Sequence, residues 1–153
     1  MSNADFPEAA ADNHSEPTPG PQAIVTTPPL GSLATLVVCV VGFVVPGMGH
    51  ILLKRWVRGA ILAASVTLMF VFGLGMNGKL YDLAEIQQPL QIFAFFADIG
   101  VGLLYWLAER SGQGIGDMTT RTFDYGTTFL WVAGLLNYLI VLDAYDIARG
   151  RKP

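Results

Sequence analysis

Apolar residues form long, nearly uninterrupted segments, separated by short polar stretches, at residues 33–53, 59–76, 90–107 and 127–142. A transmembrane β-strand would alternate apolar and polar residues, whereas these segments are apolar on nearly every side. A helix crosses a bilayer with about 20 residues. The pattern therefore predicts an all-α fold, an integral membrane bundle of about four transmembrane helices. The fourth segment is short, so its helix must take in flanking residues.

The composition agrees with lipid rather than water as the surrounding solvent. Hydrophobic residues make up 52% of the chain and charged residues only 14%, gathered at segment ends. A soluble domain would spread charges along every helix. The net charge of −3 offers no basic surface for a nucleic acid. With two His and one Cys, we predict no metal site, no cofactor and no disulfide framework.

The two ends of the chain differ from the membrane domain expected over 33–148. Residues 1–32 hold six of the nine prolines and four acids, with no Lys or Arg. This composition predicts a disordered, Pro-rich acidic tail. Residues 149–153 form a short basic tail.

The first apolar segment contains a helix-breaking motif, Pro46-Gly47-Met48-Gly49-His50. Proline removes a backbone donor and the glycines loosen the helix, so we expect a kink or a re-entrant turn at Pro46. A re-entrant turn would reduce the number of full crossings to three. His50 is either a ligand or proton carrier at broken backbone, or a structural residue bonded to backbone or headgroup.

A basic and aromatic connector follows this segment, with Lys54, Arg55, Trp56 and Arg58. These residue types anchor helices at the headgroup level, where cations meet phosphates. With four crossings, five basic residues fall on one side and four on the other, so the positive-inside rule does not set the orientation. Near the C-terminus, the spacing predicts that Asp146 pairs with Arg149 or Arg151.

Asp98 lies near the centre of the third segment. Ten Leu, Ile, Val and Phe residues there contribute roughly −3 to −6 kcal/mol to insertion, against about +3 for the acid. One helical face combines polar and small residues, namely Gln91, Ala94, Asp98, Gly102 and Tyr105. We expect this face to point inward, with Asn137 of the fourth segment as the hydrogen-bond partner of Asp98. Asp98 is either a functional residue or a structural one that holds two helices together by a hydrogen bond.

Small residues at four-residue spacing, Gly59/Ala63 and Ala60/Ala64, allow close helix contact. The favoured function is therefore non-enzymatic association with the same chain or with other membrane proteins. A second hypothesis is a small proton- or ion-linked transporter or channel component that uses Asp98, Asn137 and His50. An intramembrane enzyme comes third, because no nucleophile motif is present.

Two stretches carry a resemblance. The motif PGMGH at 46–50, with LKRW at 53–56 and Gly59, resembles the Pro-Gly-x-Gly signature of small bacterial membrane proteins distantly similar to the two-transmembrane domain. The stretches DYGTTFL at 124–130, AGLLN at 133–137 and VLDAYDIA at 141–148 resemble the end of domain-of-unknown-function family 6677. The resemblance implies a bacterial multi-span protein of the inner membrane. It implies no activity and no catalytic residue.

Overall fold

The computed structural model describes residues 30–151, and this part of the chain is helical, as predicted. Most of the predicted N-terminal tail lies outside the described residues. The helices are α1 (Ser32–Val44), α2 (Met48–Leu52), α3 (Trp56–Gly75), α4 (Pro89–Ile99), α5 (Leu103–Arg110) and α6 (Phe123–Ala148), with a short 3-10 turn η1 (Leu83–Glu85). Among the described residues, the β-structure is one isolated bridge between Lys79 and Ile115.

Two helices are long and apolar enough to cross a membrane. α3 has 20 residues and contains an 18-residue stretch with a mean hydropathy of 1.9, and α6 has 26 residues and contains such a stretch with a mean hydropathy of 1.5. At about 1.5 Å per residue, both reach the roughly 30 Å of a hydrocarbon core. The fourth apolar segment, expected to be short, therefore belongs to the longest helix. α6 takes in polar flanks, from Asp124 at its start to Asp146 near its end.

The first apolar segment is divided between α1 and α2. α1 ends at Val44, and Gly47 takes a left-handed backbone with φ of 79° before α2 begins. Gly47 also packs against α3, since a Cβ there would lie 2.4 Å from the Gly59 carbonyl oxygen. With 13 residues, α1 is shorter than a membrane span.

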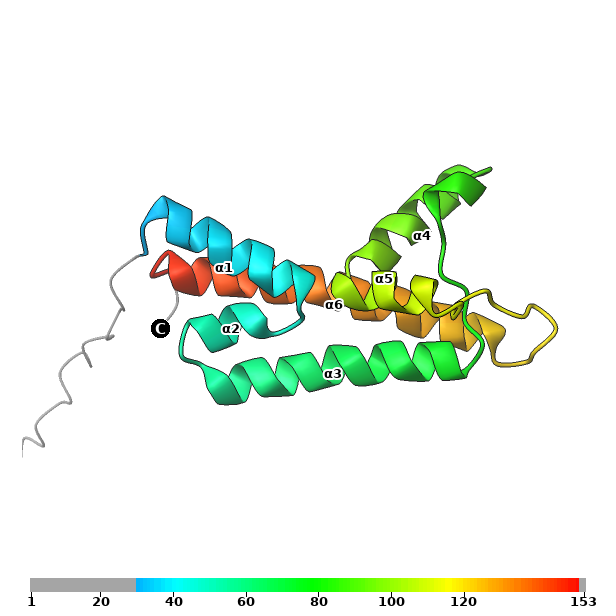
Figure 1. Ribbon diagram of the computed structural model, residues 1–153, viewed down its shortest axis with the longest axis horizontal. Coiled ribbons are helices and arrows are strands. Elements are labelled where there is room, and N and C mark those ends of the chain that lie inside the picture. Colours follow the sequence, from blue (N-terminus) through cyan, green and yellow to red (C-terminus); the bar gives the residue numbers. More distant parts are fainter. Residues whose placement is uncertain (1–29, 152–153) are drawn as a thin grey trace, which may run out of the picture.

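Both outer ends of the α1–α2 hairpin lie beside the C-terminal end of α6. The Leu30 amide donates to the Ala148 carbonyl across 2.9 Å. Leu52 and Leu53, at the end of α2, line a pocket together with Leu30 and Ala148. Figure 1 shows α1 running along α6 from this end and α2 returning toward it.

The third apolar segment is also divided, at residues 100–102. The axes of α4 and α5 differ by 106°, and Gly102 has a φ of 72°. The prediction of one continuous polar face through Asp98 and Tyr105 is therefore wrong, because these residues sit on different helices. Gly102 is where the two broken segments meet, since a Cβ there would lie 2.2 Å from the Phe43 carbonyl oxygen.

The loop before α4 and the loop after α5 lie near the N-terminal end of α6. The Leu80 amide, before α4, donates to the Gly114 carbonyl, after α5, across 2.8 Å. Gly78 packs directly on Gly126 of α6. The pair thus enters and leaves at the end of the molecule opposite to the α1–α2 hairpin, while α4 leans away from α6 (Figure 1).

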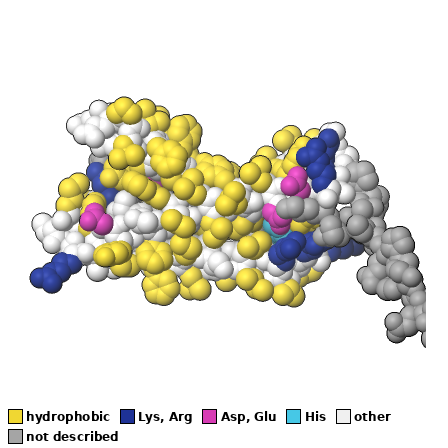
Figure 2. Space-filling model, turned by 180° about the vertical axis from the view of Figure 1, so that it is seen from behind, with side chains coloured by type: hydrophobic (Ala, Val, Ile, Leu, Met, Phe, Trp, Pro, Cys, Tyr) yellow, Lys and Arg dark blue, Asp and Glu magenta, His cyan; other side chains and the backbone are white. Residues whose placement is uncertain are grey.

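The surface separates into bands. Figure 2 shows charged side chains gathered at the two ends of one face, with apolar side chains over the length between them. Inside, α3 and α6 pack through Val66, Phe70 and Leu130, which are at most 3% exposed. Close contact needs glycine at Gly73, where a Cβ would lie 2.8 Å from the Leu130 side chain. This distribution fits a protein whose surface is in contact with lipid between its two charged ends.

Candidate functional site

Asn137 joins the two helix breaks. It is fully buried on α6, and its Nδ2 donates to the Phe43 carbonyl across 3.1 Å and to the Gly100 carbonyl across 2.8 Å. The last carbonyls of a helix have no partner within that helix. One side-chain amide therefore satisfies a carbonyl from the end of α1 and another from the end of α4.

Asp98 binds backbone and not Asn137, so the predicted Asp98–Asn137 bond is wrong. Its Oδ2 accepts a hydrogen bond from the Tyr81 amide across 2.9 Å. The Tyr105 hydroxyl donates to the Tyr81 carbonyl across 3.1 Å. Both backbone groups of Tyr81, in the loop before α4, are thus held by side chains from α4 and α5.

Several buried polar atoms near these contacts have no hydrogen-bond partner among the described residues. They are Asp98 Oδ1, Asn137 Oδ1 and Trp131 Nε1, with His50 Nδ1 on α2 as a fourth. Asp98, Asn137 and His50 have no exposed surface. A polar atom buried without a partner is costly, and it marks a place that a proton, water or ligand would satisfy.

His50 lies apart from Asp98 and makes a contact that sequence reasoning missed. Its Nε2 is 3.0 Å from Asp143 Oδ2, and Arg58 Nη1 is 3.8 Å from the same oxygen. Residues 50 and 143 are 93 positions apart, and no spacing rule connects them.

The predicted anchors lie at the end of the molecule that holds the C-terminus of α6. Lys54 and Arg55 line the same pocket as Ile147 and Ala148. Trp56 is 66% exposed at the start of α3, where an interfacial anchor would face headgroups. Arg151 is 3.6 Å from Asp146, as the spacing predicts.

Charge is unequally divided between the two ends of the molecule. We call the end that carries Lys54, Arg55, Arg58, Arg149 and Arg151 the basic end, and the end that carries Lys79, Arg110 and Arg121 the loop end. Of the three residues expected at the helix break, Pro46 and Gly47 lie between α1 and α2, whereas Gly49 lies within α2. No group of three or more His, Cys, Asp or Glu residues that could hold a metal occurs among the residues described.

The model of a family of unknown function, DUF6677, matches residues 37–153. This span contains the residues of the Asn137, Asp98 and His50 contacts. No curated protein and no solved structure matches the chain.

Proposed function

We propose that this chain, which belongs to the DUF6677 family of unknown function, is a non-enzymatic protein of the bacterial inner membrane that acts by associating with other membrane helices. Two helices, α3 and α6, are long and apolar enough to cross a bilayer. The partners are copies of itself or other membrane proteins.

The proposed topology has two crossings and two re-entrant hairpins. α3 and α6 cross, while α1–α2 enters and leaves at the basic end and α4–α5 at the loop end. Non-helical backbone is tolerated at membrane depth only where protein or a wet cavity satisfies it. Asn137 donates such hydrogen bonds to both hairpins, at the Phe43 and Gly100 carbonyls. The turn at Pro46 then belongs to the first hairpin.

This topology also sets an orientation, which a four-crossing arrangement leaves undecided. Five basic residues of the described chain lie at the basic end and three at the loop end, and Lys152 follows Arg151 in the sequence. Short loops rich in Lys and Arg stay in the cytoplasm. We therefore place the basic end, with the start of α1 and the end of α6, on the cytoplasmic side.

The observation that carries association is an outward pair of small residues on α3. Gly59 and Ala63 already pack against Gly47 of the same chain. Ala60 and Ala64, at the same spacing, are both exposed. Their neighbours Val57, Ile61 and Leu68 are large and also exposed, at 73%, 61% and 55%. Small residues four apart let a second helix approach closely.

Disulfide crosslinking in native membranes tests association. In a Cys39→Ala background, Ala64→Cys should form a crosslinked homodimer or a defined hetero-complex. Leu139→Cys is the matched control, because Leu139 is 61% exposed on α6 and lies at similar depth from the basic end. Adding Ala60→Leu should weaken the Ala64→Cys product. A strictly monomeric Ala64→Cys protein would contradict the proposal.

Proton- or ion-linked transport is the second candidate, because Asp98 Oδ1, Asn137 Oδ1 and Trp131 Nε1 are buried without partners. An acid inside a membrane domain is a recurrent element of ion and proton paths. Asp98→Asn keeps an oxygen that can accept from the Tyr81 amide while removing the titratable group. Loss of proton flux in reconstituted vesicles by this variant alone would support transport. Unchanged flux would remove Asp98 from any such path.

A further inference from the structure

A pocket of about 260 Å³ lies at the basic end, beside the C-terminus of α6. Its walls come from separate parts of the chain. Leu30 precedes α1, Leu53 follows α2, and Ile147 closes the side toward α6. The pocket is apolar within, and two cations, Lys54 and Arg55, line it as well.

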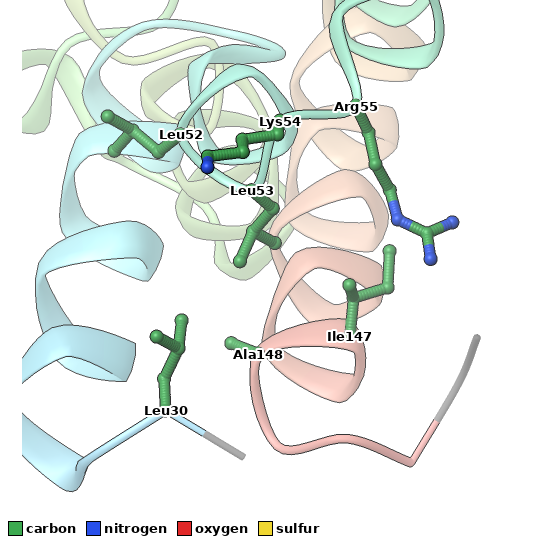
Figure 3. A pocket seen from close by; sticks show the side chains of 7 residues that line it. All are labelled: Leu30, Leu52, Leu53, Lys54, Arg55, Ile147 and Ala148. Atoms are coloured by element: carbon green, nitrogen blue, oxygen red, sulfur yellow. The ribbon is translucent and has the colours of Figure 1, made fainter. Parts of the chain in front are cut away.

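Apolar and charged groups are arranged in a definite order around this pocket. In Figure 3 the side chains of Leu30, Leu53 and Ala148 approach one common space, while Lys54 and Arg55 extend along its edge from the connector after α2. Leu30 remains 38% exposed, so the space is open on that side. A ligand there would meet apolar walls with one part and cations with another.

The connector that carries the cations has a fixed backbone. Lys54 has a φ of 60°, in the left-handed region that a residue with a Cβ rarely adopts. The Lys54 amide donates to the Ile51 carbonyl across 3.0 Å, and the Arg55 amide to the His50 carbonyl across 2.9 Å. This tight turn places two consecutive cations beside the pocket, and Figure 3 shows their side chains extending to opposite sides of it, Lys54 toward Leu52 and Arg55 toward Ile147.

We propose that this pocket binds an anionic phospholipid of the cytoplasmic leaflet. Its negatively charged headgroup lies between the flanking cations Lys54 and Arg55, and the start of one acyl chain lies on Leu30, Leu53 and Ile147. The inference depends on the proposed placement of the basic end at the cytoplasmic surface. A net negative headgroup is favoured over a zwitterionic one, because Arg58 and the cations after α6 add positive charge nearby.

Native mass spectrometry of the detergent-solubilised full chain tests this site, with phosphatidylglycerol and phosphatidylcholine added in equal amounts. The wild type should retain phosphatidylglycerol in preference. In the double variant Lys54→Gln/Arg55→Gln, the ratio of retained phosphatidylglycerol to retained phosphatidylcholine should fall about tenfold. Arg110→Gln/Arg121→Gln is the matched control, with the same charge change at the loop end, and should keep it. Equal loss in both variants, or no loss in the first, would overturn the proposal.

Two further measurements distinguish a lipid-binding site from a site that binds free phosphate. Leu30→Ser changes the exposed apolar wall without changing charge, and it should lower phosphatidylglycerol retention. Inorganic phosphate at millimolar concentration should not displace the lipid. If phosphate displaces it fully and Leu30→Ser has no effect, the pocket is not a lipid site. The assay uses isolated protein, so its result is independent of whether Ala64→Cys crosslinks.

Discussion

The side-chain amide of Asn137 lies 2.8 Å from the Gly100 carbonyl oxygen, and its second hydrogen bond reaches Phe43. Through these bonds, one residue of the long helix α6 holds the turning points of both broken segments. The two carbonyls that accept these bonds belong to helix pairs that begin at opposite ends of the molecule. The stability of the whole fold should therefore depend on this one amide.

Asn137→Leu should destabilise the protein by about 2–5 kcal/mol, because two buried carbonyls lose their donor. Unfolding in mixed micelles with increasing dodecyl sulfate measures this loss. Tyr138→Phe is the control, since it removes one bond, from the Tyr138 hydroxyl to the Phe96 carbonyl, at a more exposed place. It should cost about 1 kcal/mol or less. Equal losses from the two variants would argue against a special role for Asn137.

Gly102→Ala should be more harmful than Gly112→Ala. Both glycines have positive φ, 72° and 67°, and Gly102 has a ψ of −126°, so alanine at either site carries a backbone cost. Only Gly102 faces another segment, with the Phe43 carbonyl 2.2 Å from an added Cβ, whereas Gly112 has open space. The difference includes about 1–3 kcal/mol from overpacking at the contact between the two hairpins. No difference would mean that this contact is absent.

At the basic end, His50→Ala should cost more stability than Arg58→Gln. The imidazole is completely buried and lies 3.0 Å from Asp143, so its removal leaves a cavity and takes away the nearer partner of this carboxylate oxygen, for about 2–4 kcal/mol. Arg58 is half exposed and 3.8 Å from that carboxylate, and such a pair contributes at most about 1 kcal/mol. Thermal unfolding in detergent compares them. A larger loss for Arg58→Gln would contradict this ranking.

Hydrogen exchange of the Tyr81 amide should report the contact with Asp98. Asp98→Ala removes the acceptor 2.9 Å away, so exchange at this amide should accelerate by about tenfold or more. Asp98→Asn retains an acceptor oxygen and should leave exchange nearly unchanged. Tyr105→Phe, which removes the bond to the Tyr81 carbonyl, should give an intermediate effect. Unaltered exchange in Asp98→Ala would remove the contact from the account.

The sequence was sufficient for the helical class and for the apolar character of the chain, because composition and segment length directly reflect solvation by lipid. It also pointed to Pro46 as a disruption, since proline removes a backbone donor. The break at Gly100–Gly102 was missed. Glycine in a membrane helix normally indicates close packing, and only the contact with Phe43 makes a left-handed Gly102 necessary.

The polar partners were harder to predict than the polar residues. Asp98 and Asn137 were recognised as buried groups, yet each binds backbone atoms of a broken segment. Backbone carbonyls and amides exist at every position, so a side-chain pattern cannot show which of them are free. The His50–Asp143 contact joins residues from two ends of the sequence, and it depends on the hairpin returning to the C-terminus of α6.

The central claim is that α3 and α6 alone cross the membrane. Single cysteines at Val57, Ala84, Gln113 and Arg151, in a Cys39→Ala background, can be labelled in intact cells with a maleimide that does not cross the inner membrane. We predict labelling of Ala84→Cys and Gln113→Cys, with Val57→Cys and Arg151→Cys labelled only after permeabilisation. Four crossings would place Ala84 and Gln113 on opposite sides, and that result would contradict the account.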